Sequence, residues 1–463
     1  NSLSGAGRIA VPLENGPSGS ITAVDDKVPL EITGNLENGG FVGATSGSRL
    51  LLRADTFNNS ADANSTGLIF AQGTGARVGI SGTLSGTGAC LASGGGEITF
   101  TGNSAATNAF GAIAGGSIRH SGVGDLVGTP GGEIVAGSGG AIIVNSGNLR
   151  VAQGGRLNGL PGGNFVAHAA SAEPTAESAR RIVNGGCPSD GALVVETGSS
   201  LTGVPSIVAE NGVWIAASAE LSPGENGSGM IAIEGALHLL HGSTTSINIT
   251  SSGSDQVNAS GAITISGALQ VTLANDFVPA EGETFTIITG SSVNGAFDAL
   301  AVPALPGRRT LRPSYTGSAV VLLIAAISGY NEWLSSHFNL DEQANPMISA
   351  ATADADHDGI GNKLEYIFAS DPKQVGSPVL MTEAIHISDN GDRFLTLTFP
   401  RARGVGDGEW TIERSTDLAS GTWQIAEFEI IASVPNGDAD LLTVKVLPAI
   451  FASPQQFFRL RAN

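Results

Sequence analysis

Short apolar or alternating segments recur through residues 1–325, separated by glycine, asparagine, serine or aspartate. Runs of about five residues in which apolar and polar side chains alternate are typical of β-strands that bury one face. We predict such strands at residues 48–53, 76–80, 97–101, 141–144, 148–151 and 193–196. Helical periodicity is almost absent from this region, so the pattern predicts an all-β fold.

Many short strands with glycine-rich turns are compatible with a sandwich, a barrel or a parallel β-helix. A single sandwich or barrel seldom uses 325 residues, whereas a β-helix lengthens by stacking coils. Aromatic residues make up only 5% of the chain, and a narrow β-helix interior is filled by smaller aliphatic side chains. We therefore predict a parallel β-helix (solenoid) over residues 1–325, with stacked sandwiches as the alternative.

The remaining sequence divides into two parts. Residues 330–338 and 364–368 have helical spacing, and Asp371-Pro372 is expected to end the second helix, so 326–378 is predicted to be a helical linker. Residues 379–463 alternate again and are predicted to form a small antiparallel β-sandwich. Its six expected strands are residues 384–388, 394–399, 409–414, 423–431, 441–446 and 457–461.

One segment interrupts the solenoid pattern. Residues 169–183 contain Pro174 and are followed by Asn184-Gly185-Gly186, which favours a short helix. We interpret this excursion as a cover over an irregular coil, with a binding site as the alternative.

Charge excludes some partners. The formal net charge is −20, and the chain has only four lysines, so it lacks the basic clusters that bind nucleic acid or anionic membranes. No apolar run approaches the ~18 to 20 residues of a membrane-spanning helix. The longest run, 319–327, is predicted to be a closing strand.

Two cysteines, Cys90 and Cys187, would lie about five coils apart in a solenoid of ~20 residues per coil, on the order of 24 Å. A disulfide needs Cα atoms within about 7 Å, so both thiols are expected to be unpaired. The chain begins at Asn1 and not at Met, from which we expect a mature form or a fragment.

The most specific chemistry lies in residues 354–365, which match a twelve-residue calcium loop. Gly359 stands where the loop turns sharply. The predicted ligands, at positions one, three, five, seven, nine and twelve, are Asp354, Asp356, Asp358, the carbonyl of Ile360, Asn362 and Glu365. We predict a permanent Ca²⁺ that stiffens the junction. A calcium-gated sensor would use a Met-rich groove, and the chain has only three methionines.

No catalytic constellation is visible, and no catalytic residue or organic cofactor is predicted. The seven histidines stand in no recognisable motif, and Lys27 is the only lysine of the solenoid region. Its acidic candidates are scattered: Asp25-Asp26, Glu173, Glu177 and Asp255. The alternative to a non-enzymatic role is a polysaccharide-active lyase or glycosidase, or its glycan-binding accessory module.

Several segments resemble known families. Residues 67–82 are similar to coils of autotransporter-type and haemagglutinin-like surface proteins, and 221–324 resembles the terminal part of proteins with autotransporter-associated β-strand repeats. The region 330–372 and the sandwich after it resemble a linker and terminal domain of secreted proteins from Verrucomicrobia-like bacteria. The calcium loop is similar to thrombospondin type 3 and dockerin repeats, although a dockerin carries two such loops and this chain one.

These resemblances imply an exported, extracellular or cell-surface protein with a structural or adhesive role. Its expected partners are surface or matrix glycans or proteins.

Overall fold

The computed structural model describes most of the chain. The described residues are 2–60, 67–102, 105–122, 124–145, 147–168, 191–224, 228–274, 277–375, 381–405, 409–419, 421–447 and 456–462. Strands account for 55% of the structure and helices for 6%, which confirms the predicted all-β class.

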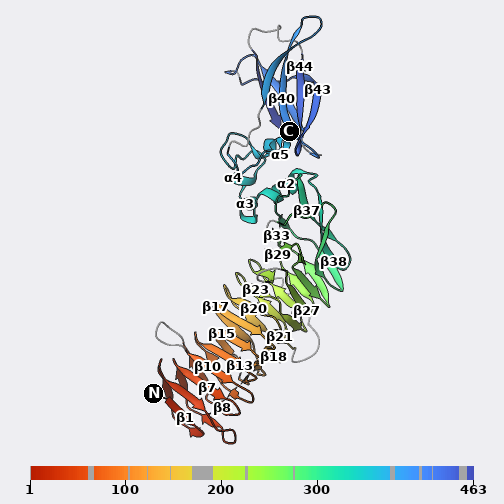
Figure 1. Cartoon of the computed structure of the whole chain (residues 1–463). Helices are drawn as coiled ribbons and strands as arrows, with labels where there is room; N and C mark the ends of the chain where they lie inside the picture. The colour runs from red at the N-terminus through yellow and green to blue at the C-terminus, as the bar shows by residue number, and fades with distance from the viewer. Residues whose placement is uncertain are drawn as a thin grey trace, which may run out of the picture. The chain divides into compact units, whose positions relative to one another are not determined.

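The first and larger part is a β-solenoid of about ten turns (Figure 1). The strands of its described residues form two sheets of 24 and 14 members. The 14-stranded sheet consists of β2 (Gly7–Ile9), β5 (Leu30–Ile32), β8 (Arg49–Leu52), β11 (Arg77–Ile80), β14 (Glu97–Phe100), β16 (Ser117–His120), β18 (Ala141–Val144), β21 (Asn164–Ala167), β24 (Ser206–Ala209), β27 (Met230–Glu234), β31 (Gln256–Ala259), β34 (Thr284–Thr289), β38 (Ala319–Ala326) and β37 (Arg309–Tyr315).

The larger sheet contains two columns of parallel strands. One column is β1 (Ser2–Gly5), β4 (Ser20–Ala23), β7 (Phe41–Thr45), β10 (Leu68–Gln72), β13 (Ala89–Ser93), β20 (Arg156–Gly159), β23 (Ser200–Gly203), β26 (Glu220–Pro223), β29 (Thr244–Thr250), β33 (Ala268–Leu273) and β36 (Ala299–Ala301). The other is β3 (Leu13–Asn15), β6 (Leu36–Asn38), β9 (Thr56–Asn59), β12 (Thr83–Ser85), β19 (Leu149–Val151), β22 (Leu193–Val195), β25 (Val213–Ile215), β28 (Leu237–Leu239), β32 (Ala262–Ile265) and β35 (Ser292–Gly295).

Two long strands join these columns. β15 (Ala105–Ile113) and β17 (Leu126–Gly137) each pair with members of both columns, which makes one continuous sheet. The two-residue β30 (Gly253–Ser254) pairs antiparallel with the end of β29. A typical coil therefore contributes one strand to each of three positions, as β7, β8 and β9 do.

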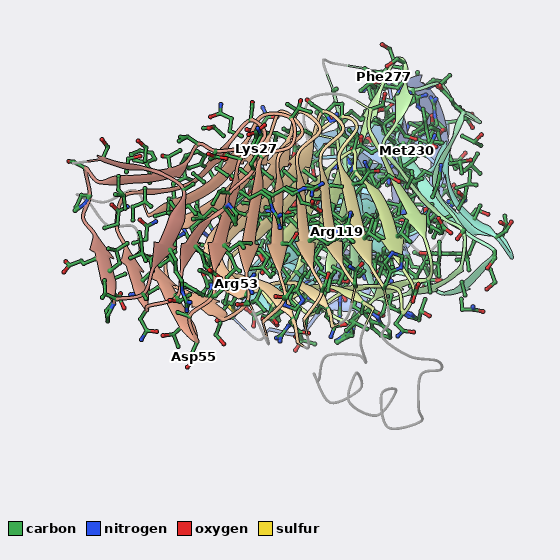
Figure 2. All side chains as sticks on the ribbon, turned by 90° about the horizontal axis from the view of Figure 1, so that it is seen from below. Lys27, Arg53, Asp55, Arg119, Met230 and Phe277 are labelled. Atoms are coloured by element: carbon green, nitrogen blue, oxygen red, sulfur yellow. The ribbon has the colours of Figure 1, made fainter. Side chains whose placement is uncertain are left out.

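Apolar side chains fill the interior because alternate residues of most solenoid strands point inward, as in β4, β8 and β14. Ile69 and Cys90 are register partners on neighbouring coils, and Cys90 in turn pairs with Phe110; all three are buried. Cys90 is a free thiol whose pKa is raised by burial, whereas Cys187 lies outside the described residues. Polar side chains such as Arg53 and Asp55 lie on the outside of the coils (Figure 2).

A ladder of buried asparagines runs through the first coils. Asn15 Nδ2 donates to Asn38 Oδ1 at 2.7 Å, and Asn38 Nδ2 donates to Asn59 Oδ1 at 2.8 Å. Asn59 then donates to the carbonyl of Ala89 at 3.0 Å. Each interior amide thus receives a partner from the next coil, which avoids the cost of burying an unpaired polar group.

The strands predicted in the solenoid agree with the structure to within about one residue, as β8, β11, β14, β18, β19 and β22 show. The predicted excursion at 169–183 lies outside the described residues. The ladder continues past it, because β19, β20 and β21 pair with β22, β23 and β24.

Among its described residues, the C-terminal part has four short helices and two antiparallel sheets. The helices are α2 (Tyr330–His337), α3 (Leu340–Ala344), α4 (Pro346–Ser349) and α5 (Asn362–Phe368). One sheet has the order β39 (Thr382–Ile387), β40 (Arg393–Ala402), β44 (Ala439–Leu447), β43 (Glu427–Asn436); the other has the order β42 (Gln424–Ile425), β41 (Trp410–Ser415), β45 (Phe457–Ala462). The predicted helices at 330–338 and 364–368 correspond to α2 and α5. The short helices α3 and α4 were not predicted from the sequence.

The chain forms two compact units: residues 1–275, 285–298 and 313–322, and residues 276–284, 299–312 and 323–463. The second unit has one hydrophobic core, to which the helices and both antiparallel sheets contribute. Trp333 of α2, Tyr366 of α5, Phe399 of β40, Ile412 of β41 and Val444 of β44 all belong to it. In the described part of the chain, no helix is long and apolar enough to cross a membrane.

Candidate metal centre

The predicted calcium loop begins after α4, curls tightly and runs into the first turn of α5. His357 and Gly359 have positive φ angles of 66° and 94°. Nothing lies within 4 Å of where a Cβ of Gly359 would stand, so glycine is favoured at this position by its backbone angle and not by lack of space.

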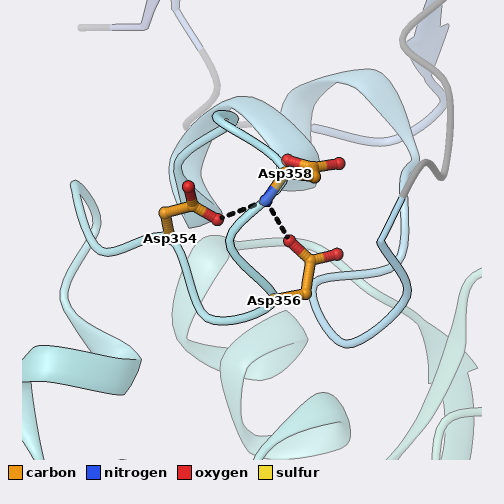
Figure 3. A group of neighbouring side chains, drawn as sticks. All are labelled: Asp354, Asp356 and Asp358. Atoms are coloured by element: carbon orange, nitrogen blue, oxygen red, sulfur yellow. Dashed lines mark hydrogen bonds between the residues drawn. The ribbon is translucent and has the colours of Figure 1, made fainter.

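The curl brings three carboxylates together. One ligand oxygen from each of Asp354, Asp356 and Asp358 lies within 4.8 Å of the others. The amide of Asp358 donates to Asp354 at 3.2 Å and to Asp356 at 3.1 Å (Figure 3). Asp354 also accepts from the amide of Gly359 at 2.9 Å, and Asp358 accepts from the amide of Ile360 at 2.8 Å. These bonds fix the carboxylates in place but do not neutralise their charge.

Asn362, the first residue of α5, is fully buried and held by its amide nitrogen. Its Nδ2 donates to the carbonyls of Ile348 at 2.6 Å and Ala350 at 2.9 Å. Both donor hydrogens are thereby used, while the buried Oδ1 has no hydrogen-bond partner in the described structure. An acceptor in this state favours a cation or another donor at the site.

Among the predicted ligands, Glu365 has the largest shift in pKa. Its side chain is 0% exposed, its Oε2 is buried without a hydrogen-bond partner among the described residues, and its Oε1 lies 3.5 Å from Ser370 Oγ. Burial first, and then repulsion from Asp356, Asp358, Asp354 and Asp371, raise the pKa of Glu365 to about 8. A buried carboxyl group that faces this much negative charge is costly unless positive charge lies beside it.

Asp356 is only half-buried but is repelled by the same group of acids. Burial, together with repulsion from Asp358 and Asp354, raises the pKa of Asp356. Its Oδ2 is also buried without a partner among the described residues. Unpaired acceptors therefore occur at loop positions three, nine and twelve, three of the positions that the calcium spacing requires.

These donors fit Ca²⁺ in kind. They are oxygens of carboxylates and an amide, the hard ligands that Ca²⁺ takes in sets of six to eight. The ammonium group of Lys363 lies over two aromatic rings, with its Nζ 5.0 Å from the ring centre of Tyr330 and 5.5 Å from that of Tyr366.

Helix α5 links this loop to the core. Glu365 is followed directly by Tyr366, Ile367 and Phe368, all of which are buried in the hydrophobic core of the second unit. The helix ends at Ala369, which adopts a left-handed conformation with φ 59°. The position of the Glu365 carboxylate is therefore coupled to the packing of three large side chains, a connection that the local loop pattern did not reveal.

The other acidic candidates from the sequence have local structural partners. Asp25 accepts from the amides of Lys27 and Val28, as expected for a turn. Asp255 is buried and accepts from the amides of Gly229 and Asn248. Burial raises the pKa of Asp255 to about 6, against the effect of both bonds. Glu173 and Glu177 lie outside the described residues.

The two histidines in and beside β28 also have structural partners. His238 stacks on Trp214 with ring centres 3.7 Å apart, and His241 contacts Asp298 at 2.9 Å. In the described part of the chain, Asp354, Asp356 and Asp358 form the metal-competent cluster of three or more side chains. Comparison of the chain with protein-family models and with curated proteins finds no match.

Proposed function

We propose that this protein is an exported surface or matrix protein with a structural or adhesive role, and that one Ca²⁺ holds its C-terminal unit together. The observation that carries the calcium part is Glu365, a fully buried carboxyl group with an unpaired oxygen beside three aspartates. Extracellular Ca²⁺ is millimolar, so even a weak site of this type would be filled outside the cell.

The solenoid supports a scaffold role by the way it uses its charged groups. Arg150 of β19 forms ion pairs with Asp125 at 3.1 Å and with Glu196, so one guanidinium bridges two acids distant in sequence. Asp255 tethers two backbone segments, and Asp298 accepts from Ser266 and the amide of Gly267. Carboxylates that already accept hydrogen bonds from the backbone or pair with arginine are poor candidates for general acid or base catalysis.

Two assays test this proposal. Protease treatment of intact producing cells should remove the chain if it is exposed outside, and a fully protected chain would contradict export. The second assay measures unsaturated products from pectin and alginate. We expect no turnover with or without Ca²⁺, whereas sustained turnover would favour the alternative of a polysaccharide lyase.

A further inference from the structure

Strand β39 lies at one edge of the four-stranded sheet of the C-terminal unit. It pairs with β40 on one side, and no described strand pairs with its other side. All six of its residues are exposed. An unpaired edge presents a row of free N–H and C=O groups, so it is a template for the addition of another strand.

The register of the β39–β40 hairpin shows which backbone groups face outward. The amide of Ser388 donates to the carbonyl of Asp392 at 2.9 Å, so these residues form a hydrogen-bonded pair at the turn. Hydrogen-bonded and non-hydrogen-bonded pairs alternate along an antiparallel ladder. Residues Glu383, Ile385 and Ile387 therefore occupy non-hydrogen-bonded positions opposite β40. Their N–H and C=O groups point away from β40, toward the open edge.

The side chains of Ile385 and Ile387 lie on the inner face of the sheet. Cross-strand partners share a face, and Ile385 pairs with Leu395, which packs against the hydrophobic core of the second unit. Ile385 is nevertheless 54% exposed and Ile387 is 59% exposed. The core thus stops short of β39 and leaves apolar surface directly beside the open edge.

The other three edges of the two described sheets are protected. β43 has a bulge between Ile430 and Ala432 and contains Pro435, which lacks an N–H group. β42 is two residues long, and β45 carries Arg459 and Arg461. Bulges, proline, short strands and charge are the devices that block edge pairing. β39 contains no proline, lysine or arginine, and its pairing with β40 shows no register shift.

We infer that β39 is a self-association surface that pairs antiparallel with β39 of a second copy of this chain. When the two-fold axis passes through Ile385, Ile385 faces its own copy and Glu383 faces Ile387 of the second copy. Every outward-facing residue of one strand then meets an outward-facing residue of the other. A two-fold contact uses the same surface on both copies, so it closes as a dimer.

Charge supports a second copy as the occupant. In this register Glu383 lies two strands from Arg393 of the second copy, on the same face, at a Cα separation of about 10 Å. These side chains carry opposite charges, which favours the approach of the two edges. No charged side chain of β39 directly opposes one of the same sign.

The size of the contact sets the expected strength. Two paired six-residue edges form a smaller contact than the roughly 1,200 Å² at the lower limit of stable interfaces. We therefore expect a weak dimer, with a dissociation constant of about 10 to 100 μM. The predicted calcium ligands lie outside β39, so dimer formation and calcium binding are measured independently.

The test is sedimentation-velocity ultracentrifugation of the full chain in calcium buffer, at protein concentrations from about 1 to 300 μM. We expect a monomer–dimer equilibrium. Ile385→Lys places two ammonium groups opposite each other on the two-fold axis and should weaken dimerisation at least tenfold. Ile425→Lys makes the same change at a 70% exposed residue of β42 and is the matched control, which should leave the dimer unchanged.

A second variant and a second measurement address the backbone directly. Ile387→Pro removes an outward-facing N–H group that β40 does not use, and it should also weaken the dimer at least tenfold. In the wild type, the amide hydrogens of Ile385 and Ile387 should exchange more slowly as the protein concentration rises. Thermal melting in calcium confirms that each variant is folded.

Several results would overturn the inference. A folded wild-type chain that stays monomeric at the highest concentration would leave β39 as an edge for a strand from another protein. Oligomers that grow without limit would indicate head-to-tail pairing of β39 with β43. Association that Ile425→Lys weakens as much as Ile385→Lys does would show a general hydrophobic contact and not strand pairing.

Discussion

The two units of this protein achieve stability in different ways. In the solenoid, each coil repeats the contacts of the last, with apolar stacks such as Ile69 on Cys90 and a short asparagine ladder. In the C-terminal unit, large aromatic side chains from separate elements share one core, and a cluster of acids lies at its edge. Repetition spreads stability over many equivalent contacts, whereas the C-terminal unit concentrates it in a few.

This difference predicts different responses to the same kind of damage. A solenoid is stabilised by neighbouring coils, so a local defect should open nearby coils and spare distant ones. A substitution in the acid cluster should instead destabilise the whole C-terminal core, because Glu365 lies in the same short helix as three buried residues of that core, Tyr366, Ile367 and Phe368.

Calcium removal is expected to have the largest effect. Saturation at 100 to 1,000 times the dissociation constant stabilises a folded unit by about 2.7 to 4.1 kcal/mol. For a unit of this size, chelation should therefore lower the melting temperature of the C-terminal transition by roughly 10 °C. The solenoid transition should move by less than about 2 °C in the same calorimetric scan.

The variant Glu365→Gln distinguishes the contribution of the bound metal to stability from that of the side chain's packing. With calcium present, the variant should melt well below the wild type because a bidentate ligand is lost. In chelator it should be as stable as the wild type or more stable, because without the metal the folded wild type must either protonate Glu365, whose pKa is raised to about 8, or bury its charge beside three aspartates. The exposed Glu383→Gln is the control. A variant that is less stable than the wild type in both buffers would point to simple packing damage.

The asparagine ladder is the corresponding target in the solenoid. Asn38→Ala removes a donor to Asn59 and an acceptor for Asn15, so two buried amide groups lose partners. We expect a loss of about 2 to 3 kcal/mol, confined to the first coils. Amide hydrogen exchange should speed up in β3, β6 and β9 and stay unchanged beyond β20. Uniformly faster exchange would contradict local stacking.

A smaller, pH-dependent effect is expected at His238. Burial lowers the pKa of His238 to about 4, from an ordinary value of 6.5. The unfolded chain therefore binds a proton between pH 6.5 and 4 that the folded chain does not, and stability falls as the pH drops through that window. Because the ring is partly exposed, we discount the full shift and expect a loss of about 1 to 2 kcal/mol.

His238→Phe preserves an aromatic partner for Trp214 and removes the proton. The free energy of unfolding of the wild type, relative to that of the variant, should fall from pH 7 to pH 4.5, as measured by denaturant-dependent amide hydrogen exchange in β25 and β28. A difference that is independent of pH would show that the histidine does not titrate in this range.

The smallest effect is expected on the surface of the C-terminal unit. Lys373 pairs with Glu342 at 2.6 Å, but both side chains are partly solvent-exposed. Lys373→Gln should cost about 0.2 to 1 kcal/mol, and less at high salt, as measured by calcium-saturated thermal melting. A cost as large as that of calcium removal would mean that surface charge, and not the buried cluster, stabilises the unit.

Sequence patterns predicted what depends on near neighbours. Alternation located strands such as β14 and β18, and ligand spacing located Asp354, Asp356 and Asp358, because both signals are contained in short segments. Long-range packing was out of reach. The contact network that joins Trp333 and Tyr366 to Phe399 and Val444 has no local signature. The asparagine ladder also depends on the register between coils, which an uneven repeat does not reveal.

The most direct test of the central claim is isothermal titration of the full chain with Ca²⁺ after exhaustive chelation. The account predicts one site per chain, abolished or weakened at least tenfold in Glu365→Gln and unchanged in Glu383→Gln. Absence of calcium binding to a folded wild-type chain, or equal binding by Glu365→Gln, would contradict it.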